Sequence, residues 1–387
     1  MDTSIFKNNN YIFVSIASYR DPQCSTTVRD LYDKAEYPEN VFVGICSQNK
    51  TDTEDETMYQ EEECLNDPDF KYKKNIRIIR LDYTQAKGPT FARYLCSTLW
   101  LGEKWFMQVD SHTLFVKNWD TKSINMINKL IDSGVKKPVI SYYPGSIEDT
   151  DEAINNEESI PIQDQQVPRV CKHFFNERGL VSYLGSEHVR YTPLPYPTPF
   201  ITGGYIFCDS LFLKELPFDP TLDYLFIGEE LLHSARFYTH GWDIFSPNQH
   251  ICFHEYTRAE KPKIWSDLTY SDNEATDRVK EMLQLKEKTD TEVSSLLKYG
   301  LGNIRSLKDF YDYAGIDVEN QRTTKNFCRY DNKLDEGDDG TYDNKPETQE
   351  TTVYSKEYYG DGNIYHPIII FISIVLIASV VYILNIK

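Results

Sequence analysis

The most informative chemistry in the sequence is an aspartate and a histidine two residues apart, directly after an apolar run. Residues 105–109 read Trp-Phe-Met-Gln-Val, and Asp110-Ser-His112 follow. In extended backbone, residues i and i+2 point the same way, so the Asp110 carboxylate and the His112 imidazole can share one cation. This pair of ligand types suits Mn²⁺ better than Mg²⁺, which prefers oxygen ligands throughout. An aspartate and a histidine at a strand end are also common turn and capping residues, so the triplet alone leaves both interpretations open.

Two later segments carry side chains that could complete such a site. His254 follows the short apolar run 251–253, and the paired carboxylates Glu229 and Glu230 follow the apolar run 225–228. A histidine in this position can equally be a hydrogen-bonded structural residue. Acidic residues at a helix start can equally be there because they stabilise the positive end of the helix dipole.

The elements that would position these residues alternate between strand and helix. This alternation is typical of an α/β fold, in which a mainly parallel sheet is flanked by helices and ligands bind at the carboxyl ends of the strands. Strands are predicted at 11–17, 41–47, 76–81, 105–110, 200–208 and 249–254, and helices at 22–36, 88–101 and 229–240.

Composition excludes several classes of protein. The chain has 387 residues, with 41 Lys and Arg against 60 Asp and Glu, which gives a net charge of −19. Its hydrophobic content of 40% can supply a substantial core, so global disorder is excluded. The acidic balance argues against nucleic acid as a partner, because phosphate binding relies on clustered Lys and Arg.

We predict one large domain over residues 1–317, followed by two appendages. Within it, 144–199 is an irregular, proline-rich insert and 273–317 is a charged helical extension. The acidic, Gly/Asp-rich stretch 318–366 is typical of a flexible linker. Residues 367–386 carry no charge and are numerous enough to cross a bilayer, which predicts a single-pass C-terminal transmembrane helix, a tail anchor. A buried core helix is the alternative interpretation.

The eight cysteines include no CxxC pair, and several lie in apolar runs. This pattern favours reduced, buried thiols over a disulfide framework. Together with the tail anchor, it predicts a membrane location with the folded domain facing the cytosol. The acid-rich stretch 51–70 is interpreted as a solvated loop rather than an ion site, because like charges this dense repel one another.

In order and spacing, these segments resemble nucleotide-sugar glycosyltransferases of the GT-A fold, a Rossmann-type mixed sheet flanked by helices. More narrowly, the chain is similar to the cytoplasmic polypeptide N-acetylglucosaminyltransferases that attach GlcNAc to hydroxyproline of a ubiquitin-ligase adaptor. The narrower resemblance covers residues 10–260. It is carried by Val14-Ser-Ile-Ala-Ser-Tyr-Arg-Asp-Pro22, Ala86-Lys-Gly-Pro-Thr-Phe-Ala-Arg93, Gln108-Val-Asp-Ser-His112 and Phe200-Ile-Thr-Gly-Gly-Tyr-Ile-Phe207.

The resemblance implies a role for each matching residue. The metal set would be Asp110, His112 and His254, with Mn²⁺ favoured over Mg²⁺. The nucleotide base and ribose would bind near Ser18, Tyr19, Arg20 and Asp21. Arg93 would contact the diphosphate or the donor sugar. The backbone at Gly203 and Gly204 would approach the sugar or the acceptor. Glu230, or less favoured Glu229, would contact acceptor or donor sugar. Each of these residues also has a purely structural interpretation. Asp21 can cap a helix, Arg93 can lie on an exposed helix surface, and the two glycines can form a β-bulge.

The implied reaction is metal-dependent transfer of a sugar, best GlcNAc from UDP-GlcNAc, to a protein hydroxyl such as hydroxyproline, with retention of configuration. The partners would be a nucleotide sugar, a protein acceptor and, through the anchor, a lipid bilayer. Two alternatives are a non-catalytic, membrane-tethered binding protein of the same fold and a metal-dependent phosphoesterase. The phosphoesterase needs further Gly-Asp and Gly-Asn-His elements, and the nearest match, Gly360-Asp361, lies in the predicted linker.

Overall fold

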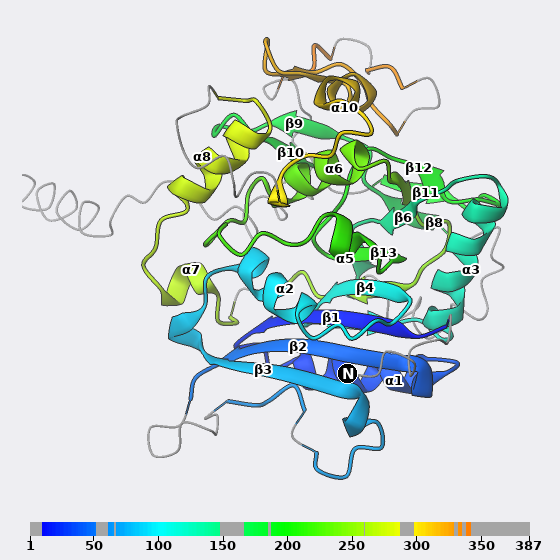
Figure 1. Cartoon of the computed structure of the whole chain (residues 1–387), viewed down its shortest axis with the longest axis vertical. Coiled ribbons are helices and arrows are strands. Elements are labelled where there is room, and N and C mark those ends of the chain that lie inside the picture. The colour runs from blue at the N-terminus through cyan, green and yellow to red at the C-terminus, as the bar shows by residue number, and fades with distance from the viewer. Residues whose placement is uncertain are drawn as a thin grey trace, which may run out of the picture. The chain divides into compact units, whose positions relative to one another are not determined.

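The central element of the computed structural model is an eight-stranded sheet with the order β12-β14-β6-β13-β4-β1-β2-β3 (Figure 1). The structure describes residues 10–51, 61–65, 67–147, 166–184, 187–258, 260–286, 298–328, 332–334 and 338–341. Within these residues, helices cover both faces of the sheet, so the predicted mixed α/β architecture is confirmed (Figure 1).

The first half of the sheet is parallel, as the strand–helix alternation predicts. Its strands are β1 (Ile12–Tyr19), β2 (Val41–Asn49), β3 (Ile76–Asp82) and β4 (Trp105–Asp110), in which β1 pairs with both β2 and β4, and β2 pairs with β3. Short apolar runs of this kind form buried strands, as β1, β2 and β4 do, whereas the edge strand β3 is only partly buried. Because these strands run the same way, their carboxyl ends meet at one edge, where Ala17 lies opposite Asp110.

The second half of the sheet is mixed. Strand β13 (Tyr205–Asp209) runs antiparallel between β4 and β6 (Pro138–Ser141), and β14 (Asp243–Ser246) runs parallel to β6. The short edge strand β12 (Tyr196–Pro197) closes this side.

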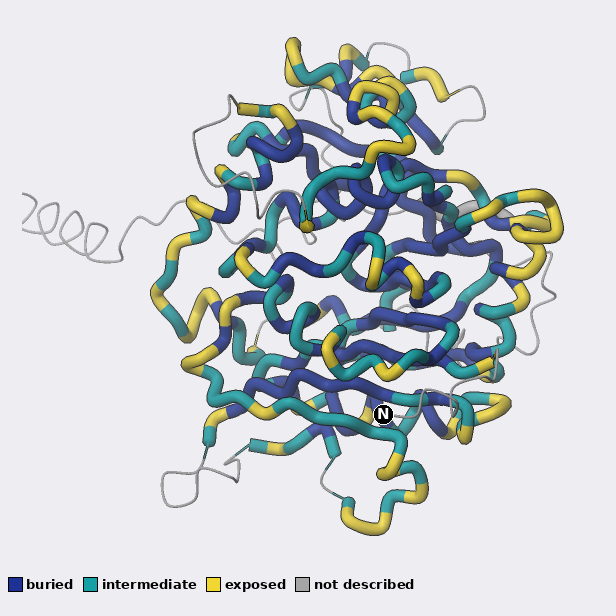
Figure 2. Tube along the Cα trace, in the orientation of Figure 1, coloured by how far each residue is buried: buried dark blue, intermediate teal, exposed yellow. Residues whose placement is uncertain are grey.

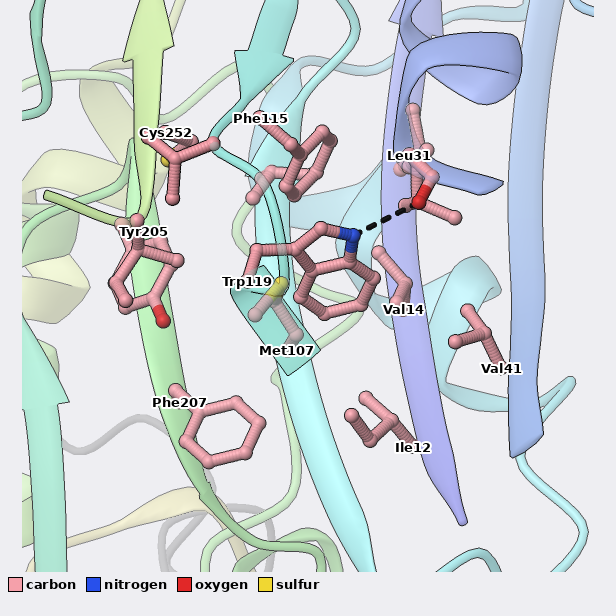
Figure 3. Close-up of a cluster of buried hydrophobic side chains, with 14 of the residues drawn as sticks. Ile12, Val14, Leu31, Val41, Met107, Phe115, Trp119, Tyr205, Phe207 and Cys252 are labelled. Atoms are coloured by element: carbon pink, nitrogen blue, oxygen red, sulfur yellow. Dashed lines mark hydrogen bonds between the residues drawn. The ribbon is translucent and has the colours of Figure 1, made fainter. Parts of the chain in front are cut away.

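Alternate residues of the strands supply two separate cores. Ile12, Val14 and Ile16 of β1 face helices α1 (Cys24–Lys34) and α3 (Trp119–Asp132). The intervening Phe13 faces the opposite way, toward the core that contains α5 (Phe212–Glu215) and α6 (Glu229–Thr239). On the first face, the Trp119 indole N–H donates to the Leu31 carbonyl oxygen at 2.8 Å (Figure 3). The buried residues form a continuous band through the sheet (Figure 2).

A small second sheet brings distant segments to the edge where β4 ends. Strand β15 (Cys252–His254) lies between β5 (Thr113–Phe115), to which it is antiparallel, and β7 (Gly145–Ser146). The register places His254 opposite Thr113. A residue at the end of β15 is therefore held beside the residues that follow β4.

The predicted insert 144–199 contains short strands where irregular structure was expected. Besides β7 and β12, they are β8 (Gln166–Arg169), β9 (His173–Phe175), β10 (Val181–Tyr183) and β11 (Glu187–Arg190). Strands of two to four residues are too short to show the period-2 pattern that identifies a strand in a sequence. Part of the insert packs in a third core with α6, α8 (Asn273–Met282) and α10 (Leu307–Ala314).

The expectation of reduced cysteines is confirmed for the buried thiols Cys46, Cys96, Cys208 and Cys252, and is wrong for the other four. Disulfides join Cys24 to Cys64 and Cys171 to Cys328, across sequence separations of 40 and 157. Such pairs form because the fold brings distant residues together, which residue spacing alone does not reveal.

The acid-rich stretch is held more tightly than a solvated loop in its described part. The Glu61 carboxylate lies 2.6 Å from the Arg20 guanidinium, and the Glu63 carboxylate lies 2.6 Å from that of Arg80. The Ser25 hydroxyl donates to Glu62 at 2.7 Å. Partners on α1, on β3 and directly after β1 therefore offset the like-charge repulsion on which the solvated-loop prediction rested.

Folded structure continues past residue 317, where the acidic linker was expected to begin. Strands β16 (Ile316–Asp317) and β17 (Arg322–Thr323) pair, Phe327 is buried, and Cys328 carries the second disulfide. Among the helices of the described ranges, none has the length and apolar character needed to cross a membrane. The predicted anchor at 367–386 lies outside those ranges, as does most of the predicted linker.

Candidate active site

The three predicted metal ligands lie together at the carboxyl edge of the sheet. Asp110 ends β4, His112 follows it, and His254 ends β15. His254 Nε2 lies 3.1 Å from Asp110 Oδ2, and the two imidazole rings meet edge-on with centroids 4.4 Å apart. One ligand atom from each residue lies within 4.8 Å of the others. A carboxylate oxygen with two imidazole nitrogens is a donor set that fits a divalent transition-metal ion.

Asp21 lies behind this cluster, although the resemblance placed it at the nucleotide. Its buried carboxylate accepts hydrogen bonds from the Ser111 hydroxyl at 2.5 Å and from His112 Nδ1 at 2.7 Å. With Nδ1–H donating to Asp21, the His112 lone pair is on Nε2. This atom now faces the Arg258 guanidinium at 2.9 Å and would bind a cation if that guanidinium moved aside. The helix-cap alternative is wrong, because the N-cap of α1 is Gln23 and no side chain caps the helix. Asp21 instead accepts from the Gln23 backbone N–H at 3.0 Å, in the turn before the helix.

Electrostatics keep Asp110 and His112 in the forms that bind metal. Burial acts to raise the pKa of Asp110, but the hydrogen bond and charge of His254, together with Arg93, hold that pKa well below its usual range. Burial and the neighbouring His254 lower the pKa of His112 to about 4, against the opposing pull of Asp21. At neutral pH the cluster therefore offers an ionised carboxylate and a neutral His112 imidazole.

Arg93 and Glu229 form a buried ion pair beside the cluster. Arg93, on α2 (Pro89–Ser97), donates from Nη1 to the two Glu229 oxygens at 2.6 and 2.7 Å, and its Nη2 lies 3.3 Å from Asp110. The two side chains are 8% and 5% exposed. Arg93 is thus neither on an exposed helix surface nor free for a phosphate; it links α6 to the metal cluster.

Glu230 is the more accessible of the paired carboxylates. It is half-buried, accepts from the Tyr143 hydroxyl at 2.5 Å, and accepts from the Gly203 backbone N–H at 2.8 Å. Burial raises the pKa of Glu230 to about 7, with Glu229 adding to the effect and Tyr143 opposing it. Glu230 therefore changes its charge near neutral pH, while Glu229 is committed to Arg93.

Gly203 and Gly204 have different neighbours in the structure. The Gly203 carbonyl accepts from Arg93 at 3.1 Å and from the Gln108 side-chain amide at 2.8 Å. A Cβ at Gly203 would lie 3.1 Å from the Arg93 guanidinium, a tight contact that would displace Arg93 by a few tenths of an ångström. At Gly204, a Cβ would meet Pro144 at 3.5 Å and Asp110 at 3.8 Å, which are ordinary contact distances.

The remaining predicted nucleotide residues lie where β1 ends. Ser18 is buried, and Gln48 of the neighbouring strand donates to its carbonyl at 3.0 Å. Arg20 has a left-handed backbone (φ 46°), and its guanidinium contacts both Glu61 and Asp267. The Tyr19 hydroxyl also donates to Asp267, at 3.0 Å.

Three residues of the site were missed from the sequence: Arg258, Asp267 and Tyr143. Arg258 Nη1 lies 2.9 Å from His112 Nε2 and 3.3 Å from Asp21, so it adds a positive charge beside the metal cluster. Asp267, on the short helix α7 (Ile264–Asp267), closes over Tyr19 and Arg20. Only the position of Arg258 four residues after His254 could have signalled any of these contacts.

Comparison with known proteins gives the family. The chain matches the family model described as glycosyltransferase (GlcNAc) over residues 11–69 and 57–320. The comparison with curated protein sequences gives no match.

Solved structures give the fold. A crystal structure of GalNAc-T7 with UDP, GalNAc and Mn²⁺ matches with a TM-score of 0.50 and 14% identity, over 80% of this chain and 57% of that one. The chain thus spans little more than half the length of that relative. Staphylococcus aureus TarS with UDP-GlcNAc matches with a TM-score of 0.41 and 12% identity, over 75% and 70% of the two chains. The mannosyltransferase PcManGT from Pyrobaculum calidifontis with GDP-Man and Mn²⁺ gives 0.36 and 12%, over 65% and 58%.

The family match extends over well more than half of the chain and includes every element that holds the site. The chain belongs to the GlcNAc glycosyltransferase family and has the GT-A fold.

Proposed function

We propose that this enzyme transfers GlcNAc from UDP-GlcNAc to a hydroxyl group of a protein, with retention of configuration. The observation that carries the proposal is the convergence of Asp110, His112 and His254 at the strand edge, beside Glu230. The family model supports the sugar, and the resemblance to hydroxyproline-specific enzymes supports the acceptor class. TarS was solved with UDP-GlcNAc, and GalNAc-T7 with UDP and Mn²⁺.

Asp110, His112 and His254 would hold a divalent cation, for which we propose Mn²⁺ because two of the three ligands are imidazoles. When bound, such a cation supplies Lewis-acid stabilisation of a diphosphate leaving group. Asp21 orients His112, and Arg93 balances the charge of Asp110. Arg258 adds a guanidinium of the kind that pairs with phosphate oxygens.

Glu230 is the proposed catalytic carboxylate, and Glu229 is assigned to holding Arg93. In its ionised form, Glu230 stabilises positive charge that develops on the sugar as the bond to the diphosphate breaks. Tyr19, Arg20 and the buried Ser18 border the strand end at which we place the nucleotide. The phosphoesterase and the non-catalytic binder are the alternatives that measurements of activity must separate from this proposal.

The proposal is tested by a nucleotide-sugar screen. The purified chain is incubated with UDP-GlcNAc, UDP-GalNAc, UDP-Glc or GDP-Man, with Mn²⁺, with Mg²⁺ or with a chelator, and release of the nucleoside diphosphate is measured. We expect release from UDP-GlcNAc to be the fastest, to require a divalent cation and to be lost in Asp110→Ala. Equal release with the chelator present, or phosphomonoester cleavage in place of sugar release, contradicts the proposal.

The membrane anchor at 367–386 and the cytosolic orientation of the folded domain also stay predictions. The disulfides Cys24–Cys64 and Cys171–Cys328 weigh against that orientation, because disulfides persist mainly in oxidising compartments. Carbonate extraction followed by protease protection of the full chain tests both predictions. Membrane retention with a digested domain supports them, and a protected domain reverses the orientation.

A further inference from the structure

Two consecutive tyrosines follow β6, and their hydroxyl groups have different surroundings. Tyr142 is fully buried; its hydroxyl donates to the Cys252 carbonyl at 3.2 Å and accepts from the Cys252 backbone N–H at 3.3 Å. Tyr143 is half-buried, and its hydroxyl donates to Glu230 Oε2 at 2.5 Å. Tyr142 thus joins β6 to β15 in the core, whereas Tyr143 reaches the site.

The backbone on both sides of Tyr143 is fixed. The Tyr142 carbonyl accepts from the Thr202 hydroxyl at 2.7 Å, and the Pro144 carbonyl accepts from the Tyr256 hydroxyl at 2.8 Å. Beyond Pro144, β7 pairs with β15, the strand that ends in His254. The position of the Tyr143 ring is therefore set by the same framework that sets the metal ligand.

The Glu230 carboxylate is held at both oxygens. Oε1 accepts from the Gly203 N–H at 2.8 Å, and Oε2 accepts from Tyr143. The charged groups that act on Glu230 are Glu229, its neighbour on α6, and Arg93 on α2. Since Arg93 lies against Glu229 and Asp110, the direct contacts of Glu230 are the neutral donors Tyr143 and Gly203.

We propose that Tyr143 is a positioning residue for sugar transfer: its hydroxyl fixes the orientation of the Glu230 carboxylate. The inference rests on the proposed function, because it takes Glu230 as the catalytic carboxylate. It adds a residue that neither the sequence motifs nor the metal cluster identifies.

The effect on charge has a definite sign. Burial raises the pKa of Glu230 to about 7, and the bonds from Tyr143 and Gly203 hold it from rising further. A phenylalanine at position 143 keeps the ring and removes the donor. The remaining burial and the charge of Glu229 then raise the pKa above about 7, so that less of the enzyme carries an ionised Glu230 at neutral pH.

The test compares Tyr143→Phe with Tyr142→Phe, a matched pair in which each variant loses one hydroxyl from adjacent rings. The kcat and the KM for UDP-GlcNAc are measured with saturating Mn²⁺ from about pH 5.5 to about pH 9. For Tyr143→Phe we expect kcat at pH 7 to fall about tenfold, since a hydrogen bond to a charged group is lost, with KM for the donor within about twofold of wild type. The acidic limb of the kcat profile should move to higher pH, and Glu230→Gln should lack that limb.

Tyr142→Phe should lower the melting temperature and leave the acidic limb in place. A Tyr143→Phe enzyme with an unmoved acidic limb and an unchanged kcat overturns the inference. Infrared titration of the Glu230 carboxyl band, identified by its loss in Glu230→Gln, gives a readout that needs no turnover. If wild type processes no nucleotide sugar, the proposed function fails; an upward shift of that band in Tyr143→Phe would still support the contact, and no shift would refute it.

Discussion

Two sides of the site hold a carboxylate in opposite states. On the cation side, formed by Asp110, His112 and His254, the carboxylate meets two imidazoles and Arg93, and its pKa is held well below the usual range. On the acidic-helix side, formed by Glu229 and Glu230 at the start of α6, Glu230 meets neutral donors, and its pKa is raised to about 7. Both carboxylates experience desolvation, so the nearby charges decide the outcome. Two carboxylates whose pKa values are shifted in opposite directions are typical of active sites in which they have different catalytic roles.

The largest effect is expected when the Asp110 carboxylate is removed from the cation side. We expect Asp110→Ala to reduce sugar transfer about a thousandfold, because the ion that would offset the leaving-group charge loses its carboxylate ligand. Isothermal titration calorimetry with Mn²⁺ should show no binding. Mn²⁺ binding as in wild type would contradict the assigned role of Asp110, and Asp209→Ala, on the same sheet, serves as a surface-charge control.

The next effect separates the two neighbouring glutamates. Glu229→Gln leaves the Arg93 guanidinium buried without its bidentate partner, so we expect the free energy of unfolding to fall by about 3 kcal/mol in urea denaturation. Glu230→Gln, the matched variant one residue away, should abolish most transfer without a comparable loss of stability. Equal stability losses for the two variants would mean that the division of roles between them is wrong.

A smaller effect is expected behind the cation side. Asp21→Ala removes the acceptor of the His112 Nδ1–H, and a lost partner of this kind typically weakens metal affinity by about 10- to 100-fold. Calorimetry with Mn²⁺ in the absence of donor measures this change directly. Asp21→Asn should recover part of the affinity because its amide oxygen still accepts. A role at the nucleotide alone predicts unchanged Mn²⁺ affinity and weaker UDP binding.

The smallest effect concerns stability and pH on the acidic-helix side. The pKa of Glu230 is about 7 in the folded chain against 4.5 for an unperturbed glutamate, so the folded state binds this proton more tightly. Its contribution to stability is complete below the unfolded pKa and is lost as pH rises toward the folded value. Glu230→Gln should therefore be more stable than wild type at pH 8, by about 1 kcal/mol for a half-buried group, and equal to it near pH 4. Thermal melts at both pH values test this sign.

The first half of the fold could be predicted from the sequence because its strands are rich in apolar residues, and three of the four, β1, β2 and β4, are mostly buried. Such strands appear as predominantly apolar runs, and 11–17, 41–47, 76–81 and 105–110 each lie within two residues of β1 to β4. The edge strand β3, which carries Arg77 and Arg80, is only partly buried. The metal cluster could be anticipated for a related reason: Asp110, His112 and His254 each follow an apolar strand. The family resemblance supplied their grouping, and the structure brings them together.

The rest of the site depends on contacts that cross the fold. Asp21 appeared to be a nucleotide residue because it follows β1, yet its partners come from residues 111 and 112, about ninety positions away. Arg93 appeared available for a phosphate, but Glu229, 136 positions later, occupies it. The disulfides escaped prediction for the same reason, since Cys171 and Cys328 are 157 positions apart. Local sequence patterns do not predict which distant side chain will pair with a charged residue.

The backbone of Gly203 links the cation side of the site to the acidic-helix side. Its carbonyl oxygen is gripped by Arg93, which also touches Asp110, while its N–H is the donor to Glu230. These two groups belong to the consecutive peptide units on either side of the Gly203 Cα, so a change of the backbone torsions at Gly203 shifts the partner of one carboxylate relative to the partner of the other. A ligand that displaces this backbone must therefore change the contacts of Arg93 and of Glu230 together. The distance between the two carboxylates thus limits which substrates can bind between them.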